Sequence, residues 1–114
     1  MPPVLVHRAS GSVEWIRTRG LPLGAAKDFP YQTHTLHLGP GDVLLLMSDG
    51  LSERFNPKDE ILGEERVADC LAQLETRDGE EIVATLVALG ETWANGRAAE
   101  DDIAMVVLVR SEAE

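Results

Sequence analysis

The sequence predicts an α+β fold, a mainly antiparallel sheet with two helices packed on it. Strand-like runs occupy the first half of the chain, two segments with helical spacing follow, and one apolar strand closes it. The chain has 114 residues, of which 44% are hydrophobic. A chain of this length buries enough surface for one hydrophobic core, so we expect residues 1–114 to form a single domain.

The first strands form a predicted hairpin. Residues 4–7 and 13–17 are β-prone runs on either side of Ser10-Gly11-Ser12, which favours a turn. The segment 21–24 contains a proline and a glycine, so it is expected to be a loop. Residues 31–38 show strand-like alternation and predict a further strand.

A turn signal precedes the most apolar strand of the chain. In Gly39-Pro40-Gly41-Asp42 the proline presets one turn angle and the second glycine can adopt a positive φ. The strand that follows, 43–47, is apolar at every position, which predicts burial on both of its faces. It leads directly into Ser48-Asp49-Gly50.

Two helices are predicted in the second half. The first opens at Gly63-Glu64-Glu65, and apolar residues then recur every three or four positions. The second begins near residues 78–81, where acidic residues suit a helix N-terminus, and ends at Asn95-Gly96. Its apolar stripe is interpreted as a packing face made of Ile82, Leu86, Leu89 and Trp93.

The closing strand, 103–109, is entered directly from Glu100-Asp101-Asp102 and is also predicted to be buried. If it is the antiparallel neighbour of strand 43–47, Asp49 faces Asp101 or Asp102 at one end of the sheet. Clustered carboxylates repel one another unless a cation lies among them, and oxygen-only clusters suit Mg²⁺ or Mn²⁺. The alternative interpretation is structural: Asp49-Gly50 is an ordinary turn, and the aspartate pair is a solvated strand entry.

Charge and composition exclude several classes of function. The formal net charge is −10, which repels nucleic acid and anionic membrane surfaces. The longest apolar run, 43–47, is too short to span a bilayer, and we identify no signal peptide, so a cytoplasmic location is expected. The single cysteine, Cys70, is interpreted as core packing. The spacing of the three histidines does not favour a zinc site.

Several short signatures lie in the order found in one phosphatase family. They are Pro2-Pro3-Val4-Leu5, Gly20-Leu21-Pro22-Leu23-Gly24, the run from Leu38 to Leu51, the residues Glu53, Asn56 and Glu60 to Gly63, and Asp101-Asp102-Ile103 with the strand that follows. The sequence therefore resembles the PPM-type (PP2C-like) serine/threonine protein phosphatases of the SpoIIE/RsbU class. The resemblance covers nearly the whole chain, and it implies half of a PP2C-like α-β-β-α sandwich.

The resemblance implies metal-dependent hydrolysis of phosphoserine or phosphothreonine. By position in the motifs, Asp49 and Asp101 would be metal ligands, Asp102 a less direct candidate, and Gly50 a backbone position that lets the chain turn tightly beside the ion. The cofactors implied are Mn²⁺ or Mg²⁺, two of them in the complete family site. The implied partner is a phosphoprotein substrate, such as an anti-sigma-factor antagonist, in bacterial stress or sigma-factor signalling.

The sequence also departs from the family pattern. The family's N-terminal half, with its metal-binding "AD-x-SGHG" segment, has no counterpart in residues 1–114, so the chain is expected to be a partial domain, the C-terminal half. Ala104 stands where a threonine is usual, and Ser48 also replaces a threonine. The alternative function is therefore a non-catalytic phosphatase-like interaction module. Uncovered sheet surfaces predict a homodimer or a need for the absent half.

Overall fold

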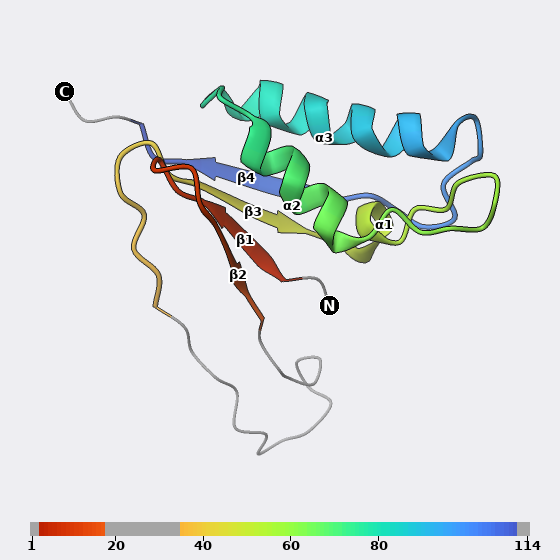
Figure 1. Cartoon of the computed structure of the whole chain (residues 1–114), viewed down its shortest axis with the longest axis horizontal. Coiled ribbons are helices and arrows are strands. Elements are labelled where there is room, and N and C mark those ends of the chain that lie inside the picture. The colour runs from red at the N-terminus through yellow and green to blue at the C-terminus, as the bar shows by residue number, and fades with distance from the viewer. Residues whose placement is uncertain (1–2, 18–34, 112–114) are drawn as a thin grey trace, which may run out of the picture.

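The computed structural model describes residues 3–17 and 35–111, which form one sheet and three helices (Figure 1). The elements in chain order are β1 (Val4–His7), β2 (Val13–Ile16), β3 (Val43–Met47), α1 (Asp49–Ser52), α2 (Glu64–Gln73), α3 (Gly79–Ala94) and β4 (Met105–Val109). The sheet order is β2-β1-β3-β4, and every pair of neighbours is antiparallel. The predicted α+β class, with helices on an antiparallel sheet, is confirmed.

The sheet is built on β3, which lies between β1 and β4. The predicted hairpin is present, with Val4 opposite Ile16 and His7 opposite Val13. The register of β3 with β4 runs from Val43 opposite Val109 to Met47 opposite Met105. The two apolar strands are therefore antiparallel neighbours, as the sequence analysis required for its candidate site.

α2 and α3 pack together on one face of the sheet (Figure 1). The side chain of Asp78 accepts hydrogen bonds from the backbone N–H groups of Glu80 and Glu81, which caps α3, and Asn95 ends the helix with a φ of 46°. The predicted stripe on α3 faces the sheet. The core between helices and sheet consists of Leu5, Val43, Leu45, Leu51, Leu62, Val67, Ala68, Leu71, Ile82 and Leu86. The half-buried Cys70 packs against this core, as interpreted, and burial raises the pKa of its thiol.

The prediction that strand 43–47 is buried on both of its faces is wrong, and strand 103–109 is not fully buried as predicted either. On the sheet face away from the helices, called here the outer face, Leu46 is 41% exposed, Val106 52% and Leu108 51%. Successive side chains of a strand point to opposite faces, and both long helices lie on the same face. The alternate residues of β3 and β4 are therefore exposed within the part of the chain that the structure describes. β4 also begins at Met105 rather than at residue 103.

The predicted strand 31–38 is not observed where the structure describes it. Residues 31–34 lie outside the described residues, and residues 35–38 are irregular. Two of their carbonyl groups accept hydrogen bonds from arginine side chains, His37 from Arg8 and Leu38 from Arg110, instead of from a neighbouring strand. The predicted turn is present, with a φ of 82° at Gly41. The expected loop 21–24, the signature 20–24 and the first residue of the signature 2–5 also lie outside the described residues.

None of the helices formed by the described residues is both long and apolar enough to cross a membrane.

Candidate metal site

The pairing of β3 with β4 brings the two acidic segments to the same end of the sheet. The last pair of the ladder is Met47 opposite Met105, and the backbone N–H of Ser48 donates to the carbonyl of Ala104 at 2.8 Å. Asp49 is the residue after Ser48, and Asp101 and Asp102 lie shortly before Ala104 in the chain. α1 accordingly lies beside the segment that connects α3 to β4 (Figure 1).

The Ser48 side chain joins the two segments. Its hydroxyl donates to the carbonyl of Asp102 at 3.3 Å and accepts from the backbone N–H of Ala104 at 3.0 Å. In the sequence, Ser48 stands out only as a replacement for threonine, so this role is not predicted from it. The sequence carries one signal for this role: serine and the threonine usual at this position both have a hydroxyl, which can donate and accept hydrogen bonds at one atom.

Gly50 allows the backbones of the two segments to approach each other. A Cβ at this position would lie 2.0 Å from the carbonyl oxygen of Asp102 and 2.8 Å from its carbonyl carbon. Gly50 is helical, in α1, and is not one of the positive-φ glycines. The tight turn predicted for this residue is therefore not the reason for glycine, which is required because no side chain fits here.

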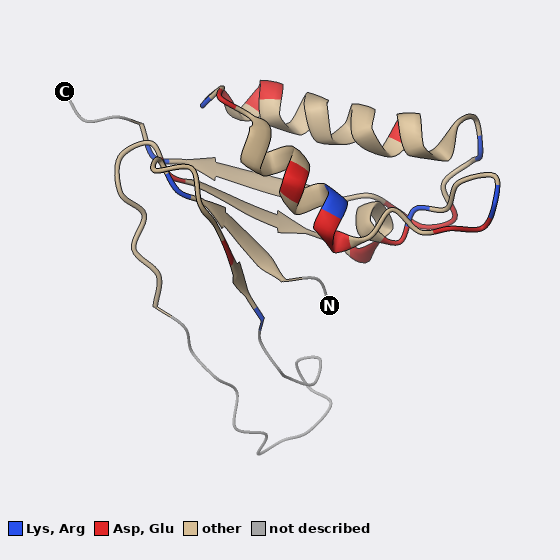
Figure 2. Cartoon of the chain, in the orientation of Figure 1, with Lys and Arg blue, Asp and Glu red and all other residues tan. Residues whose placement is uncertain are grey.

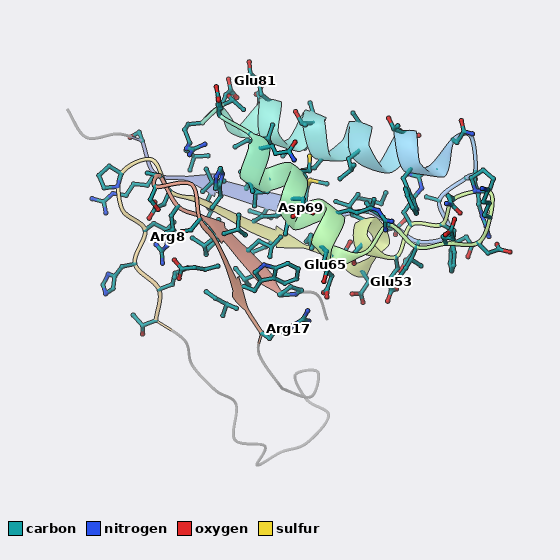
Figure 3. The ribbon with its side chains drawn as sticks, in the orientation of Figure 1. Arg8, Arg17, Glu53, Glu65, Asp69 and Glu81 are labelled. Atoms are coloured by element: carbon teal, nitrogen blue, oxygen red, sulfur yellow. The ribbon has the colours of Figure 1, made fainter. Side chains whose placement is uncertain are left out.

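The three candidate carboxylates differ in their surroundings. Asp49 is half-buried in the first turn of α1 and lines a hollow of about 250 Å³ with Ser52, Glu53, Ile61, Gly63 and Glu64. Asp101 is exposed and lines a second hollow, of about 260 Å³, with Gly50, Glu53, Arg54, Phe55 and Glu100. Glu53 contributes to both hollows, and Figure 3 shows its side chain beside α1. The structure thus brings the segments together but places Asp49 and Asp101 in adjacent hollows.

Asp102 contributes mainly through its backbone. Its side chain is exposed, whereas its carbonyl contacts Gly50 and accepts the Ser48 hydroxyl. Its N–H donates to the Asp101 carboxylate at 2.8 Å, which orients that carboxylate from within its own segment. Acidic residues gather in the loops around α1, and Figure 2 shows them there.

These residues fit a divalent cation in kind but not in number. Carboxylate and backbone carbonyl oxygens are the donors that Mg²⁺ and Mn²⁺ take. Within residues 3–17 and 35–111, however, no three His, Cys, Asp or Glu side chains are gathered so that they could hold a metal ion. The segments at Asp49 and Asp101 can therefore supply part of a metal site.

A buried carboxylate lies at the opposite end of β3 and has a different role. Asp42 accepts hydrogen bonds from the backbone N–H groups of Ala9 and Gly39, both at 2.7 Å, and from the Arg8 guanidinium at 2.9 Å. The Ala9 N–H, the Arg8 side chain and the Gly39 N–H together lower the pKa of Asp42 to about 2. This carboxylate fixes the hairpin turn against residues 39–42 and is a structural group.

Comparison with known proteins places the chain in a family. Residues 1–111 match the family described as Stage II sporulation protein E (SpoIIE). No curated protein matches the chain. The SpoIIE phosphatase domain of Bacillus subtilis is 22% identical, with a TM-score of 0.72 over 99% of this chain and 50% of that one.

Other solved structures show the same fold. A structure of the PP2C phosphatase domain of Bacillus subtilis SpoIIE with a fragment of its regulatory domain is 27% identical, with a TM-score of 0.77, and the match covers 93% of this chain and 30% of that one. The SiaA-PP2C domain of Pseudomonas aeruginosa is 19% identical, with a TM-score of 0.79, over 94% of this chain and 42% of that one. The chain thus spans half or less of each of these structures. It belongs to the SpoIIE family, and its fold is that of a portion of a PP2C phosphatase domain.

Proposed function

We propose that this chain is the C-terminal part of a metal-dependent phosphatase domain that hydrolyses phosphoserine or phosphothreonine, and that Asp49 and Asp101 are ligands of Mn²⁺ or Mg²⁺. The observation that carries the proposal is the β3–β4 register, which ends at Met47 opposite Met105 and brings the two acidic segments side by side. Family membership supports the chemistry, and one structure of the Bacillus subtilis phosphatase domain came from a crystal presoaked with Mn.

The residues of this chain have separate tasks in the proposed site. The negative charges of Asp49 and Asp101 attract the cations, and Asp102 is a weaker ligand candidate. Ser48 and Gly50 hold the two segments in register through the Asp102 carbonyl. Bound divalent cations would supply an activated water and neutralise the charge on phosphoryl oxygens.

The remaining ligands are proposed to come from the other part of a complete domain. Two carboxylates do not hold Mg²⁺ or Mn²⁺ tightly, because the rest of the coordination falls to water. The chain covers 50% of the phosphatase domain that it matches over 99% of its own length. We therefore expect residues 1–114 alone to bind Mn²⁺ weakly and to show little or no phosphatase activity.

The biological setting is also part of the proposal. The matched Bacillus subtilis protein is described as a cell fate determinant, which supports a role in bacterial stress or sigma-factor signalling. The substrate would be a phosphoprotein, such as an anti-sigma-factor antagonist, in the cytoplasm. The net charge of −10 argues against nucleic acid and anionic membranes as partners.

Calorimetric titration with Mn²⁺ tests the ligand assignment. The chain is compared with Asp49→Asn, Asp101→Asn and, as a matched control, Asp69→Asn, which removes an exposed carboxylate on α2. The proposal expects weak binding that is lost in the first two variants and kept in the third. Absence of binding to the unaltered chain, or equal binding by all four proteins, would contradict it.

A second candidate function is a non-catalytic phosphatase-like interaction module, and the outer face of the sheet favours it. The exposed Leu46, Val106 and Leu108 form an apolar surface of the kind that marks protein contacts. The occupant would be a second copy of the chain or the other part of the domain. Association that is independent of Mn²⁺ and unchanged in Asp49→Asn would support this function.

A further inference from the structure

Arg54 is a buried arginine beneath the C-terminal part of α3. Its side chain is 6% exposed. The guanidinium donates from Nη1 to the Glu91 carboxylate and from Nη2 to the backbone carbonyl of Arg97, both at 3.1 Å. Gly90 of α3 lies next to the Arg54 guanidinium. A Cβ on Gly90 would be 3.0 Å from the Leu51 side chain, so α3 approaches closely here because it has no side chain at this position. Arg54 therefore ties the segment that follows α1 to the end of α3 and to the chain beyond it.

Stability alone does not account for a buried arginine at this position. Its only side-chain partner among the described residues, Glu91, is 66% exposed, and the Arg54 Nε is buried without a hydrogen-bond partner in that part of the chain. Burying a charge with incomplete pairing costs free energy, and an apolar residue of similar volume often packs with equal or better stability. What an apolar residue could not do is hold the Arg97 carbonyl.

Arg97 makes the second half of the connection. Its guanidinium donates to the carbonyl of Asn56 at 3.0 Å, to the Asp59 carboxylate, and to the Glu100 carboxylate at 2.6 Å. It also stacks over the Phe55 ring, 5.0 Å from the ring centroid. Arg97 thus binds the loop after α1 with one nitrogen and, with the other, the residue immediately before Asp101.

The segment that carries Asp101 is therefore fixed at both ends. Arg54 and Arg97 hold its beginning, at residues 97–100, against the loop after α1. Ser48 holds its end, through the Asp102 carbonyl and the Ala104 N–H. Asp49 lies in α1, between Ser48 and Arg54 in the sequence. Both sets of hydrogen bonds thus connect the Asp49 segment to the Asp101 segment.

We propose that Arg54 and Arg97 are positioning residues that set Asp101 against Asp49, so that the two carboxylates can share one divalent cation. This inference rests on the proposed function for its metal and goes beyond it in naming the residues that align the site. Neither arginine is a ligand. Partners that orient metal ligands typically change metal affinity about 10–100-fold when they are removed.

Mn²⁺-induced broadening of backbone amide signals in NMR spectra tests the inference on the full chain. In the unaltered protein the signals of Asp49 and Gly50 and those of Asp101 and Asp102 are expected to broaden together, at one Mn²⁺ concentration. In Arg97→Ala all four signals should require about 10–100-fold more Mn²⁺ to broaden equally, because one shared cation broadens both segments. Arg54→Ala should do the same, and Arg54→Lys should restore part of the loss because lysine can still donate to the Arg97 carbonyl.

Arg66→Ala is the matched control, because Arg66 donates to the Leu62 carbonyl and stacks on Trp93 but makes no hydrogen bond to residues 97–102. Its broadening should match that of the unaltered chain. The inference would be overturned if Arg97→Ala broadened at the same Mn²⁺ concentration as the unaltered chain. It would also be overturned if Arg66→Ala needed as much additional Mn²⁺ as Arg97→Ala. Partial unfolding of Arg54→Ala does not obscure the result, since Arg97→Ala and Arg54→Lys report independently.

Hydrogen exchange separates this inference from the proposed function. If Mn²⁺ broadens neither segment in the unaltered chain, the metal assignment fails, and alignment is judged from exchange at the Ala104 amide. Faster exchange there in Arg97→Ala, with unchanged exchange in the middle of α3, supports the positioning role. Equal exchange at Ala104 in the variant and the unaltered chain overturns it.

Discussion

The carbonyl oxygen of Asp102 lies against the α-carbon of Gly50, so closely that a Cβ on Gly50 would be 2.0 Å from it. This contact joins the first turn of α1 to the segment that enters β4, and each side carries a candidate ligand. The contact is between two backbones, so neither can move aside as a flexible side chain could. Glycine is the residue that permits the contact, and the arrangement of the candidate site depends on it.

Gly50→Ala should therefore destabilise the protein and separate the two acidic segments. Overpacking of this kind typically costs about 1–3 kcal/mol. Gly79→Ala is the control, since nothing lies within 4 Å of a Cβ there and α3 should tolerate or favour alanine. Urea denaturation of both variants measures the effect. Equal unfolding midpoints for the two variants would contradict the contact.

Ser48→Ala should loosen the same junction from the other side. The variant loses the hydroxyl that donates to the Asp102 carbonyl and accepts from the Ala104 N–H, and about 1–2 kcal/mol of unfolding free energy is expected to go with these bonds. Ser48→Thr keeps the hydroxyl and should remain close to the unaltered protein. Thermal unfolding compares the three proteins. A Thr variant as unstable as the Ala variant would show that the hydroxyl is not what matters.

The lowered pKa of Asp42 predicts that the unfolding free energy of the protein decreases in acid. Its pKa in the folded protein is lowered to about 2, chiefly by the Ala9 N–H and the Arg8 side chain, so its contribution is present above the unfolded value of 3.8 and is lost as the pH falls toward 2. Figure 3 shows Arg8 at the end of the sheet where the hairpin turns. The unfolding free energy of the unaltered chain should decrease across this interval.

Asp42→Asn should be about 1–3 kcal/mol less stable at pH 7, because it loses hydrogen bonds made to a charged group. It should also show a shallower decrease between pH 5 and pH 2 than the unaltered chain, since the titrating group is gone. Asp69→Asn, on the exposed side of α2, serves as the control and should follow the unaltered chain at every pH. Parallel pH profiles for Asp42→Asn and the unaltered chain would refute the assignment.

The elements that the sequence predicted well are those specified by local signals. α2 begins, and α3 begins and ends, within a residue or two of the prediction, because Gly63, Asp78 and Asn95 act on their own neighbours. The antiparallel pairing of β3 with β4 entered the sequence interpretation as a condition for the candidate site, and the structure meets that condition. That pairing was enough to place Asp49 near the Asp101 segment.

The features that sequence analysis missed depend on what packs against each residue. The five apolar residues of β3 are compatible with burial on one face or on two, and only the placement of both helices decides between them. The alternation in residues 31–38 resembles a strand, yet Arg8 and Arg110 take two of the carbonyl groups. Arg54 has no pattern that marks it as buried, since its burial results from α3 crossing above it. The separate hollows of Asp49 and Asp101 likewise follow from side-chain packing.

The apolar outer face predicts self-association. Leu46, Val106 and Leu108 are each more than 40% exposed on the outer face, and pairing that face with a second copy would remove them from water. Sedimentation velocity should therefore show an average sedimentation coefficient that rises with protein concentration. Val106→Lys should reduce or abolish the rise, because pairing would then bury an unpaired charge.

Val87→Lys is the control that separates an effect of the outer face from an effect of the added positive charge. Val87 is 43% exposed on α3, so lysine there changes the net charge by the same amount without touching the outer face. The Val87 variant should associate like the unaltered chain, whereas the Val106 variant should not. Because the net charge is −10, either lysine slightly weakens repulsion between copies, and a loss of association in Val106→Lys cannot come from added repulsion. A sedimentation coefficient independent of concentration in the unaltered chain would rule out pairing through the outer face.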